Sequence, residues 1–144
     1  DQIFEDPQFT DIHAITTGRG FQGPVKRFGI GLTSHKAEKA RRNPGSLGPW
    51  KGQTHIMWRV AHAGQTGYHT RTEYNKKIIK ISTNPEEVNP KGGIAHYGKV
   101  KNTFALIRGS IPGPKKRMIV LTQPIRSKRK SSKEKPIIEY ISTK

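Results

Sequence analysis

The sequence predicts an all-β fold built from short strands. Fifteen glycines and ten prolines are spread over 144 residues, so the backbone turns often and long helices are disfavoured. Between these turn residues lie short runs in which apolar side chains alternate with polar ones, as in half-buried strands. Only 31% of the residues are hydrophobic, which suffices for a small barrel or sandwich core and leaves many residues outside it.

Seven runs qualify as strands. The first places Ile12 and Ala14 on one face, and the second repeats Ile56, Trp58 and Val60 at a period of two, which is the period of a strand. In chain order the expected strands are residues 11–17, 56–61, 77–82, 94–100, 103–109, 117–122 and 137–141.

Two short segments could suggest helices or a phosphate loop. Residues 36–42 are the best helix candidate, but they span only about two turns and have no apolar face. Residues 18–23, GRGFQG, superficially resemble a glycine-rich phosphate loop, yet no helical pattern follows and no Lys-Ser/Thr pair is placed as a P-loop demands. We interpret them as a tight turn after a strand, and residues 111–114 as a second turn.

The charge is large and unevenly distributed. The chain carries 27 Lys and Arg against 10 Asp and Glu, a net charge of +17. Between residues 12 and 72, ten bases face a single acid, Glu38. Such one-sided charge repels itself unless an anion neutralises it, which indicates nucleic acid, an anionic membrane or an acidic protein as a partner. No apolar run approaches the ~18 residues of a membrane span, and no Cys is present, so thiolate metal sites are excluded.

Two basic stretches do not fit a compact barrel. Residues 26–54 are rich in Gly and Pro and lack alternating apolar residues, and loops this long are usually either functional or disordered. Residues 126–135 hold six bases and one acid, and such runs are most often solvated tails. Trp50 lies within the first stretch, and two placements are equally open: stacking on an unpaired base or packing back onto the barrel.

The histidines and the 61–77 segment complete the candidate chemistry. Residues 61–77, AHAGQTGYHTRTEYNKK, interleave glycines, aromatic rings, polar side chains and cationic side chains. This mixture is suited to contacts with phosphates, riboses and nucleobase faces, although an irregular connection between strands would look the same.

The spacing of His62 and His69 matches no standard zinc pattern. No nucleophile motif and no clustered carboxylates accompany the six histidines, so an enzymatic interpretation is a minor one.

Five phrases occur in one order along the chain: ITTGRGFQGPVKRFG, SLGPW, GQTGYHTRTEYNKKI, GGIAHYGKV and IRGSIPGPKKRMIVLTQPIR. Together they closely resemble the universal large-subunit ribosomal protein L-three family in its archaeal and eukaryotic form. The resemblance covers nearly the whole chain. It implies the C-terminal half or more of a family member, with an N-terminal portion absent.

The resemblance implies a partial translation-protein-type split β-barrel with a long basic extension. Residues 1–25 and 55–126 would form the barrel. Residues 26–54 would form the extension, reaching into RNA toward the peptidyl transferase centre with Trp50 at its tip. Residues 127–144 would form a basic tail with a candidate final strand.

We therefore expect a structural constituent of the large ribosomal subunit, in the cytoplasm, with no catalytic residues, cofactor, metal, membrane or small-molecule substrate. Its expected partners are large-subunit ribosomal RNA and neighbouring ribosomal proteins. The residues alone leave two alternatives: a basic nucleic-acid-binding module outside the ribosome, such as a chromatin architectural protein, and an RNA-processing enzyme using His62, His69 or His96. The expected RNA-binding residues are Arg19, Lys26, Arg27, His35, Lys36, Lys39, Arg41, Arg42, Trp50, Lys51, Arg59, His69, Arg71, Asn75, Lys76, Lys77, Lys115 and Lys116.

Overall fold

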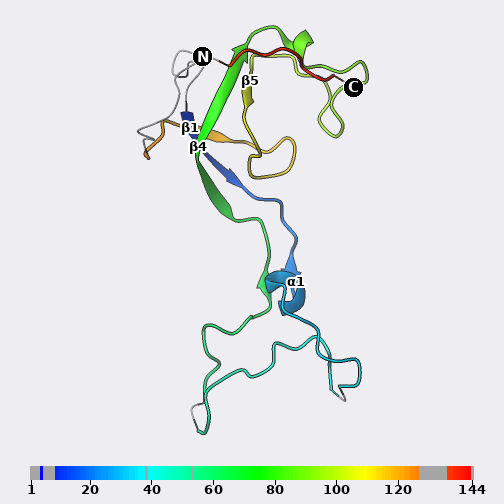
Figure 1. The fold of residues 1–144 in the computed structure, drawn as a ribbon, viewed down its shortest axis with the longest axis vertical. Helices are drawn as coiled ribbons and strands as arrows, with labels where there is room; N and C mark the ends of the chain where they lie inside the picture. Colours follow the sequence, from blue (N-terminus) through cyan, green and yellow to red (C-terminus); the bar gives the residue numbers. More distant parts are fainter. Residues whose placement is uncertain (1–3, 5–8, 38, 53, 127–135, 144) are drawn as a thin grey trace. The chain divides into compact units, whose positions relative to one another are not determined.

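A computed structural model of the chain describes residue 4 and residues 9–37, 39–52, 54–126 and 136–143. The chain divides into two units: a sheet unit, Asp1–Thr16 with Thr70–Lys144, and an arm unit, Thr17–His69. The sheet unit holds four strands and the arm unit a two-strand ribbon followed by long irregular loops (Figure 1). Strands dominate the regular structure, so the expected all-β class is confirmed.

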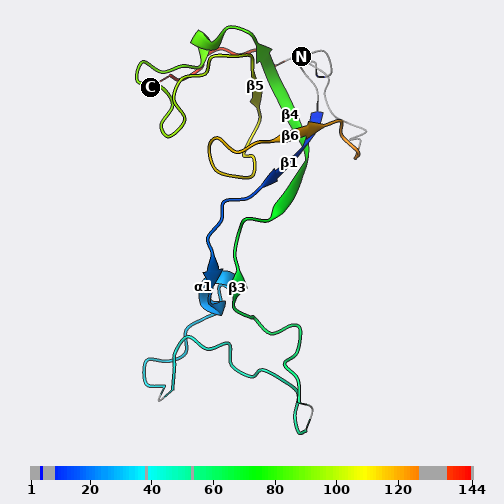
Figure 2. The same ribbon diagram turned by 180° about the vertical axis from the view of Figure 1, so that it is seen from behind.

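The sheet has the strand order β5-β4-β1-β6 (Figure 2). β1 (Phe9–Ile15) lies between β4 (Thr70–Ser82) and β6 (Val120–Thr122), and β5 (Phe104–Ile107) pairs with the far side of β4. All three pairings are antiparallel. Within the described residues β5 and β6 are edge strands, so closure of this sheet into a barrel stays a prediction.

The core of the sheet unit is small and centred on β1. Thr10, Ile12 and Ala14 alternate along one face of the strand and are at most 6% exposed, and Ile78 of β4 is fully buried. This alternation is the strand period expected from the sequence, and the predicted burial of Ile12 and Ala14 is confirmed.

The pairing of β1 with β4 contains a bulge. Thr10 faces Lys76 whereas Ile12 faces Glu73, so two residues of β4 oppose one residue of β1. One of the two, Asn75, has a positive φ of 56°. Asn adopts this left-handed conformation more readily than most residues because its short polar side chain can hydrogen-bond locally, so the bulge has a residue suited to it.

The arm unit begins with a small ribbon and a short helix. β2 (Phe21–Gln22) pairs with β3 (Gly64–Gln65), and α1 (Pro24–Phe28) follows β2. The interpretation that no helix follows the 18–23 turn was wrong. Pro24 occupies the first helical turn and Gly29 caps the end with φ 68°, and this Pro-then-Gly pattern is a helix signature that the sequence carries.

Four predicted strands are present with altered boundaries. The strand expected at 11–17 is Phe9–Ile15, that at 103–109 is Phe104–Ile107, and that at 117–122 is shortened to Val120–Thr122. The strand expected at 77–82 is the end of β4, which starts at Thr70. The polar residues 70–76 are therefore strand as well, because β1 supplies hydrogen-bonding partners along them.

Three predicted strands are not formed. Residues 56–61 contain a turn closed by the Val60 N–H donating to the Met57 carbonyl at 3.1 Å. Residues 94–100 also form a turn, because His96 and Gly98 have positive φ values that a strand cannot accommodate; only an isolated bridge joins Ile94 to Gly98. Residues 137–141 have no strand neighbour among the described residues, and Ile137 is 91% exposed. A short 3-10 helix, η1 (Pro85–Glu87), follows β4.

Candidate nucleic-acid interface

Most of the predicted RNA-binding residues fall in the arm unit. Twelve of the eighteen belong to Thr17–His69, a range that contains nine Lys and Arg residues and only one acidic residue, a Glu. The described Lys and Arg side chains there are exposed, except for the half-buried Arg27. The six predicted residues in the sheet unit are Arg71, Asn75, Lys76, Lys77, Lys115 and Lys116.

The ribbon fixes where the arm unit begins and ends. The Arg19 N–H donates to the Thr66 carbonyl and the Thr66 N–H donates to the Gly20 carbonyl, both at 2.8 Å, which lengthens the β2/β3 pairing. Gly67, with φ 69°, approaches the Thr17 carbonyl so closely that a Cβ would collide with it. The first residues of the arm unit, 17–20, are therefore held next to its last residues, 66–67, by hydrogen bonds and close backbone contact.

Beyond the ribbon, side chains hold an irregular backbone in place. Arg27 donates from Nη1 to the His62 carbonyl at 2.8 Å, its guanidinium lies against Gly64, and it stacks over the Phe28 ring at 4.9 Å. Arg27 therefore has a structural role joining α1 to β3. The sequence did not reveal this role.

Hydrogen bonds between Thr33 and Arg41 close the loop of residues 33–41. The Thr33 N–H donates to the Arg41 carbonyl at 3.2 Å, and Arg41 Nε donates to the Thr33 carbonyl at 3.3 Å. Leu32, Arg41 and Arg42 line an open groove there with Ala40. This closure leaves the bases nearby, Lys36, Lys39 and Arg42, in solvent, where they can neutralise phosphates along an extended backbone.

Trp50 is 87% exposed. The sequence left stacking and back-packing equally open, and the structure places this indole in solvent. The next residue, Lys51, has φ 59°, so a sharp backbone turn follows the ring. An exposed indole next to a cationic side chain such as Lys51 is suited to stacking on an unpaired nucleobase.

The six predicted residues in the sheet unit are more engaged in the fold. Lys76 forms an ion pair with Glu73, Lys115 donates to the Ala95 carbonyl at 2.6 Å, and Arg71 donates to its neighbour's carbonyl at 3.0 Å. Asn75 and Lys116 both have positive φ values. These observations give the residues structural roles alongside any RNA contact.

Sequence reasoning missed three exposed aromatic residues of the arm unit, Phe21, Phe28 and Trp58. Trp58 is 92% exposed and Phe21 is 78% exposed. Trp58 was assigned to a strand because Ile56, Trp58 and Val60 are spaced two residues apart. That spacing alone does not show whether a partner strand exists. The neighbouring cation Arg59, already among the expected RNA-binding residues, was the available signal for an exposed segment.

His13 and His62 contact threonine hydroxyls and a backbone carbonyl, respectively. No group of three or more His, Cys, Asp or Glu side chains that could hold a metal occurs among the described residues. In the sheet unit, His13 bridges Thr72 and Thr122 through its two ring nitrogens, at 2.8 and 3.1 Å. In the arm unit, His62 lies 3.4 Å from the Met57 carbonyl. The His13 ring thus links the side chains of β4 and β6 across β1, and the His62 ring lies against the backbone of residue 57.

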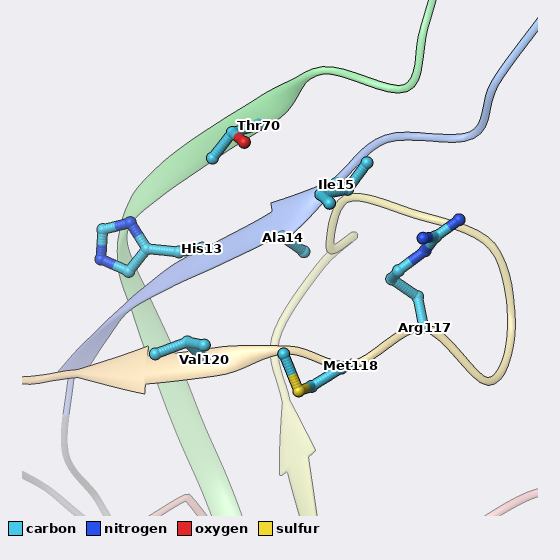
Figure 3. A pocket seen from close by; sticks show the side chains of 7 residues that line it. All are labelled: His13, Ala14, Ile15, Thr70, Arg117, Met118 and Val120. Atoms are coloured by element: carbon cyan, nitrogen blue, oxygen red, sulfur yellow. The ribbon is translucent and has the colours of Figure 1, made fainter.

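One apolar groove of about 250 Å³ lies in the sheet unit. Figure 3 shows Ala14 and Ile15 on β1, with Arg117 and Met118 on the segment that leads into β6. This volume is below the roughly 300–1,000 Å³ of typical small-molecule sites. The lining residues are His13, Ala14, Ile15, Thr70, Arg117, Met118 and Val120.

Within the part of the chain that is described, no helix is both long and apolar enough to cross a bilayer. Residues 127–135, half of the predicted basic tail 127–144, lie outside the described residues.

Comparison with known proteins gives a consistent result over the full length. A family model described as "Ribosomal protein L3" matches residues 1–144. The chain is similar to proteins named "Large ribosomal subunit protein uL3": 50% identical over 143 residues in Methanococcoides burtonii, 52% over 146 in Methanobrevibacter smithii, and 51% over 146 in Methanothermobacter thermautotrophicus. These alignments cover 98–99% of this chain and 42–43% of the relatives, so the chain spans less than half their length.

Proposed function

Since the chain belongs to the ribosomal protein L3 family, we propose that it is a structural constituent of the large ribosomal subunit rather than an enzyme. Its role is to bind large-subunit ribosomal RNA and to support assembly of the particle. Neighbouring large-subunit ribosomal proteins are its other expected partners. The names of the relatives support this proposal at the level of the subunit.

The observation that carries the RNA-binding proposal is the charge of the arm unit. Nine Lys and Arg residues against one Glu give this unit a strong positive potential. Its loops are held by hydrogen bonds to backbone groups, from both main chain and side chains, and none of its described residues is buried. A polyanion stabilises such a unit by offsetting the repulsion between its bases. Folded RNA is such a polyanion, and its unpaired nucleobases can stack on the exposed aromatic side chains.

The finer proposal concerns the 26–54 extension. We assign it the task of filling space between converging RNA helices, with Trp50 and Lys51 at its tip near the peptidyl transferase centre. The anchor in this proposal is the sheet unit, whose residues 1–16 and 70–126 lie within the expected barrel ranges 1–25 and 55–126, whereas residues 17–25 and 55–69 of those ranges belong to the arm unit. Residues 127–144 would supply an additional basic contact. In this arrangement the chain performs no chemistry itself. It offsets phosphate repulsion and fixes the geometry of an RNA centre.

Sucrose-gradient sedimentation of cell extract tests the proposal. The chain is expected to co-migrate with large subunits even after a moderate salt wash, because bound RNA encloses its contacts. A protein acting on chromatin would instead sediment away from large subunits and follow DNA. Binding of the purified chain to large-subunit ribosomal RNA in preference to duplex DNA gives the matching measurement in solution.

A further inference from the structure

The turn Met57–Val60 presents an aromatic ring and a cation together at an exposed position. The Val60 N–H donates to the Met57 carbonyl at 3.1 Å, so Trp58 and Arg59 occupy the two central positions of the turn. Trp58 is 92% exposed and Arg59 is exposed as well.

The turn is fixed by its surroundings. The Met57 N–H donates to the Leu47 carbonyl at 3.0 Å, and His62 lies 3.4 Å from the Met57 carbonyl. His62 in turn accepts, through its own carbonyl, the hydrogen bond from Arg27 at 2.8 Å. The backbone beneath Trp58 is therefore tied to two other segments of the arm unit, and the ring is presented from a held position.

Trp58 also lies beside a recess. An open groove is lined by His55, Ile56, Met57, Trp58 and Arg59. It therefore combines an indole face, aliphatic side chains, an imidazole and a guanidinium. A planar nucleobase can stack on the indole while the guanidinium contacts the adjoining phosphate, and neither contact depends on the identity of the base.

We propose that the Trp58–Arg59 turn is a second stacking site of the arm unit, which takes one unpaired nucleotide of RNA. The inference rests on the proposed RNA-binding function and deepens it by naming single-stranded RNA as the ligand at this turn. A double helix keeps its base faces covered, so it offers the indole no partner. The positive charge of the surrounding unit favours a nucleic acid over a neutral protein surface as the occupant.

Tryptophan fluorescence can observe this turn alone, because Trp50 and Trp58 are the two tryptophans of the chain. Trp50→Phe leaves Trp58 as the reporter, and Trp58→Phe leaves Trp50. Each full-length variant is titrated with a single-stranded oligoadenylate and with a blunt RNA duplex of the same length. We expect the single strand to quench Trp58 emission and the duplex to leave it nearly unchanged.

Affinity measurements with labelled RNA complete the test. Trp58→Ala should weaken binding of the single strand by about ten-fold and leave duplex binding unchanged, whereas Trp58→Phe should retain most of the affinity. Arg59→Ala is the matched electrostatic variant, and it should weaken both RNAs and flatten the salt dependence. Because Trp58 is almost fully exposed, neither substitution at this position should change the circular dichroism spectrum.

Three results would overturn the inference. If the chain binds large-subunit ribosomal RNA but Trp58 emission and Trp58→Ala affinity do not respond to single strands, the stacking site is wrong and the proposed function stands. If Trp58→Ala binds every RNA normally yet is lost from large subunits on a gradient, the turn contacts a protein. Failure of the unmodified chain to bind ribosomal RNA at all would remove the proposed function and this inference together.

Discussion

The Asp11 carboxylate accepts the backbone N–H of Asn75 through Oδ1 at 2.8 Å, where β4 bulges opposite β1. Its second oxygen accepts the N–H of Ile125 at 3.0 Å. Asp11 is fully buried, so one side chain joins the centre of the sheet to the segment that follows β6. These bonds satisfy backbone groups that the bulge and the strand end leave without ladder partners.

Replacing Asp11 by Ala should destabilise the sheet unit by about 2–5 kcal/mol, because two partly buried N–H groups lose their charged, buried acceptor. Asp11→Asn retains one acceptor oxygen but turns an NH₂ group toward the other N–H, so it should cost about 1–3 kcal/mol. Urea unfolding followed by circular dichroism gives both values. Glu139→Gln, at an exposed site, is the control. Equal stability of Asp11→Ala and the control would contradict a structural role for the carboxylate.

Asn75 allows its structural and RNA-binding roles to be separated. Its φ of 56° suits Gly, so Asn75→Gly should keep the bulge while it removes the side-chain amide. Asn75→Val should cost about 1–3 kcal/mol, since a β-branched residue is strained in the left-handed region. Thermal unfolding distinguishes the two variants. Reduced affinity of Asn75→Gly for ribosomal RNA would support the predicted amide contact, and unchanged affinity would leave Asn75 with the backbone role alone.

The sheet unit was the more predictable part of the chain because its strands have partners. β1 and β5 were found from alternation alone, and the period-two spacing of Ile12 and Ala14 identified two of the three buried apolar residues that the structure describes. The N-terminal part of β4 was not found. Residues 70–76 are polar, and they form a strand because β1 offers them hydrogen bonds from more than 50 residues away, which no local pattern records.

The arm unit shows where alternation misleads. Ile56, Trp58 and Val60 have the period of a strand, yet no strand lies beside them within the described residues and Trp58 is exposed. Charge gave a separate prediction there, because the excess of Lys and Arg marked the arm as the candidate interface without reference to any strand. Charge does not reveal that Arg27 donates a hydrogen bond to the His62 carbonyl, because a guanidinium can donate to a phosphate and to a backbone carbonyl equally well.

Gly67 and Gly29 form a matched pair for testing the closure of the arm. Their φ values are 69° and 68°, but a Cβ at Gly67 would collide with the Thr17 carbonyl, whereas a Cβ at Gly29 meets open space. Gly29→Ala should cost about 1 kcal/mol, the ordinary left-handed penalty, and Gly67→Ala should cost clearly more. Hydrogen exchange at the Arg19 and Thr66 amides reports the ribbon. Similar exchange in both variants would show that the ribbon does not depend on this close approach.

Arg42 should contribute to RNA affinity through its charge. It is exposed and lines the open groove beside Leu32 and Arg41. Arg42→Ala should weaken binding to ribosomal RNA fragments of different sequence by a similar factor, and should lower the slope of log affinity against log salt by about 1. Lys101→Ala, an exposed base of the sheet unit, is the control. A loss confined to one RNA sequence, with an unchanged slope, would indicate base recognition instead.

Trp50 tests the role proposed for the tip of the extension. Its ring is 87% exposed, so Trp50→Ala removes no packing and should change the free energy of unfolding by less than about 0.5 kcal/mol. In reconstituted large subunits the same change should alter accommodation of aminoacyl-tRNA or the response to antibiotics that bind the RNA centre, because the indole no longer supports the RNA around it. Trp50→Phe keeps an aromatic face and should restore part of the effect. Subunits carrying Trp50→Ala that match the unmodified ones in both assays would place the functional tip of the extension elsewhere.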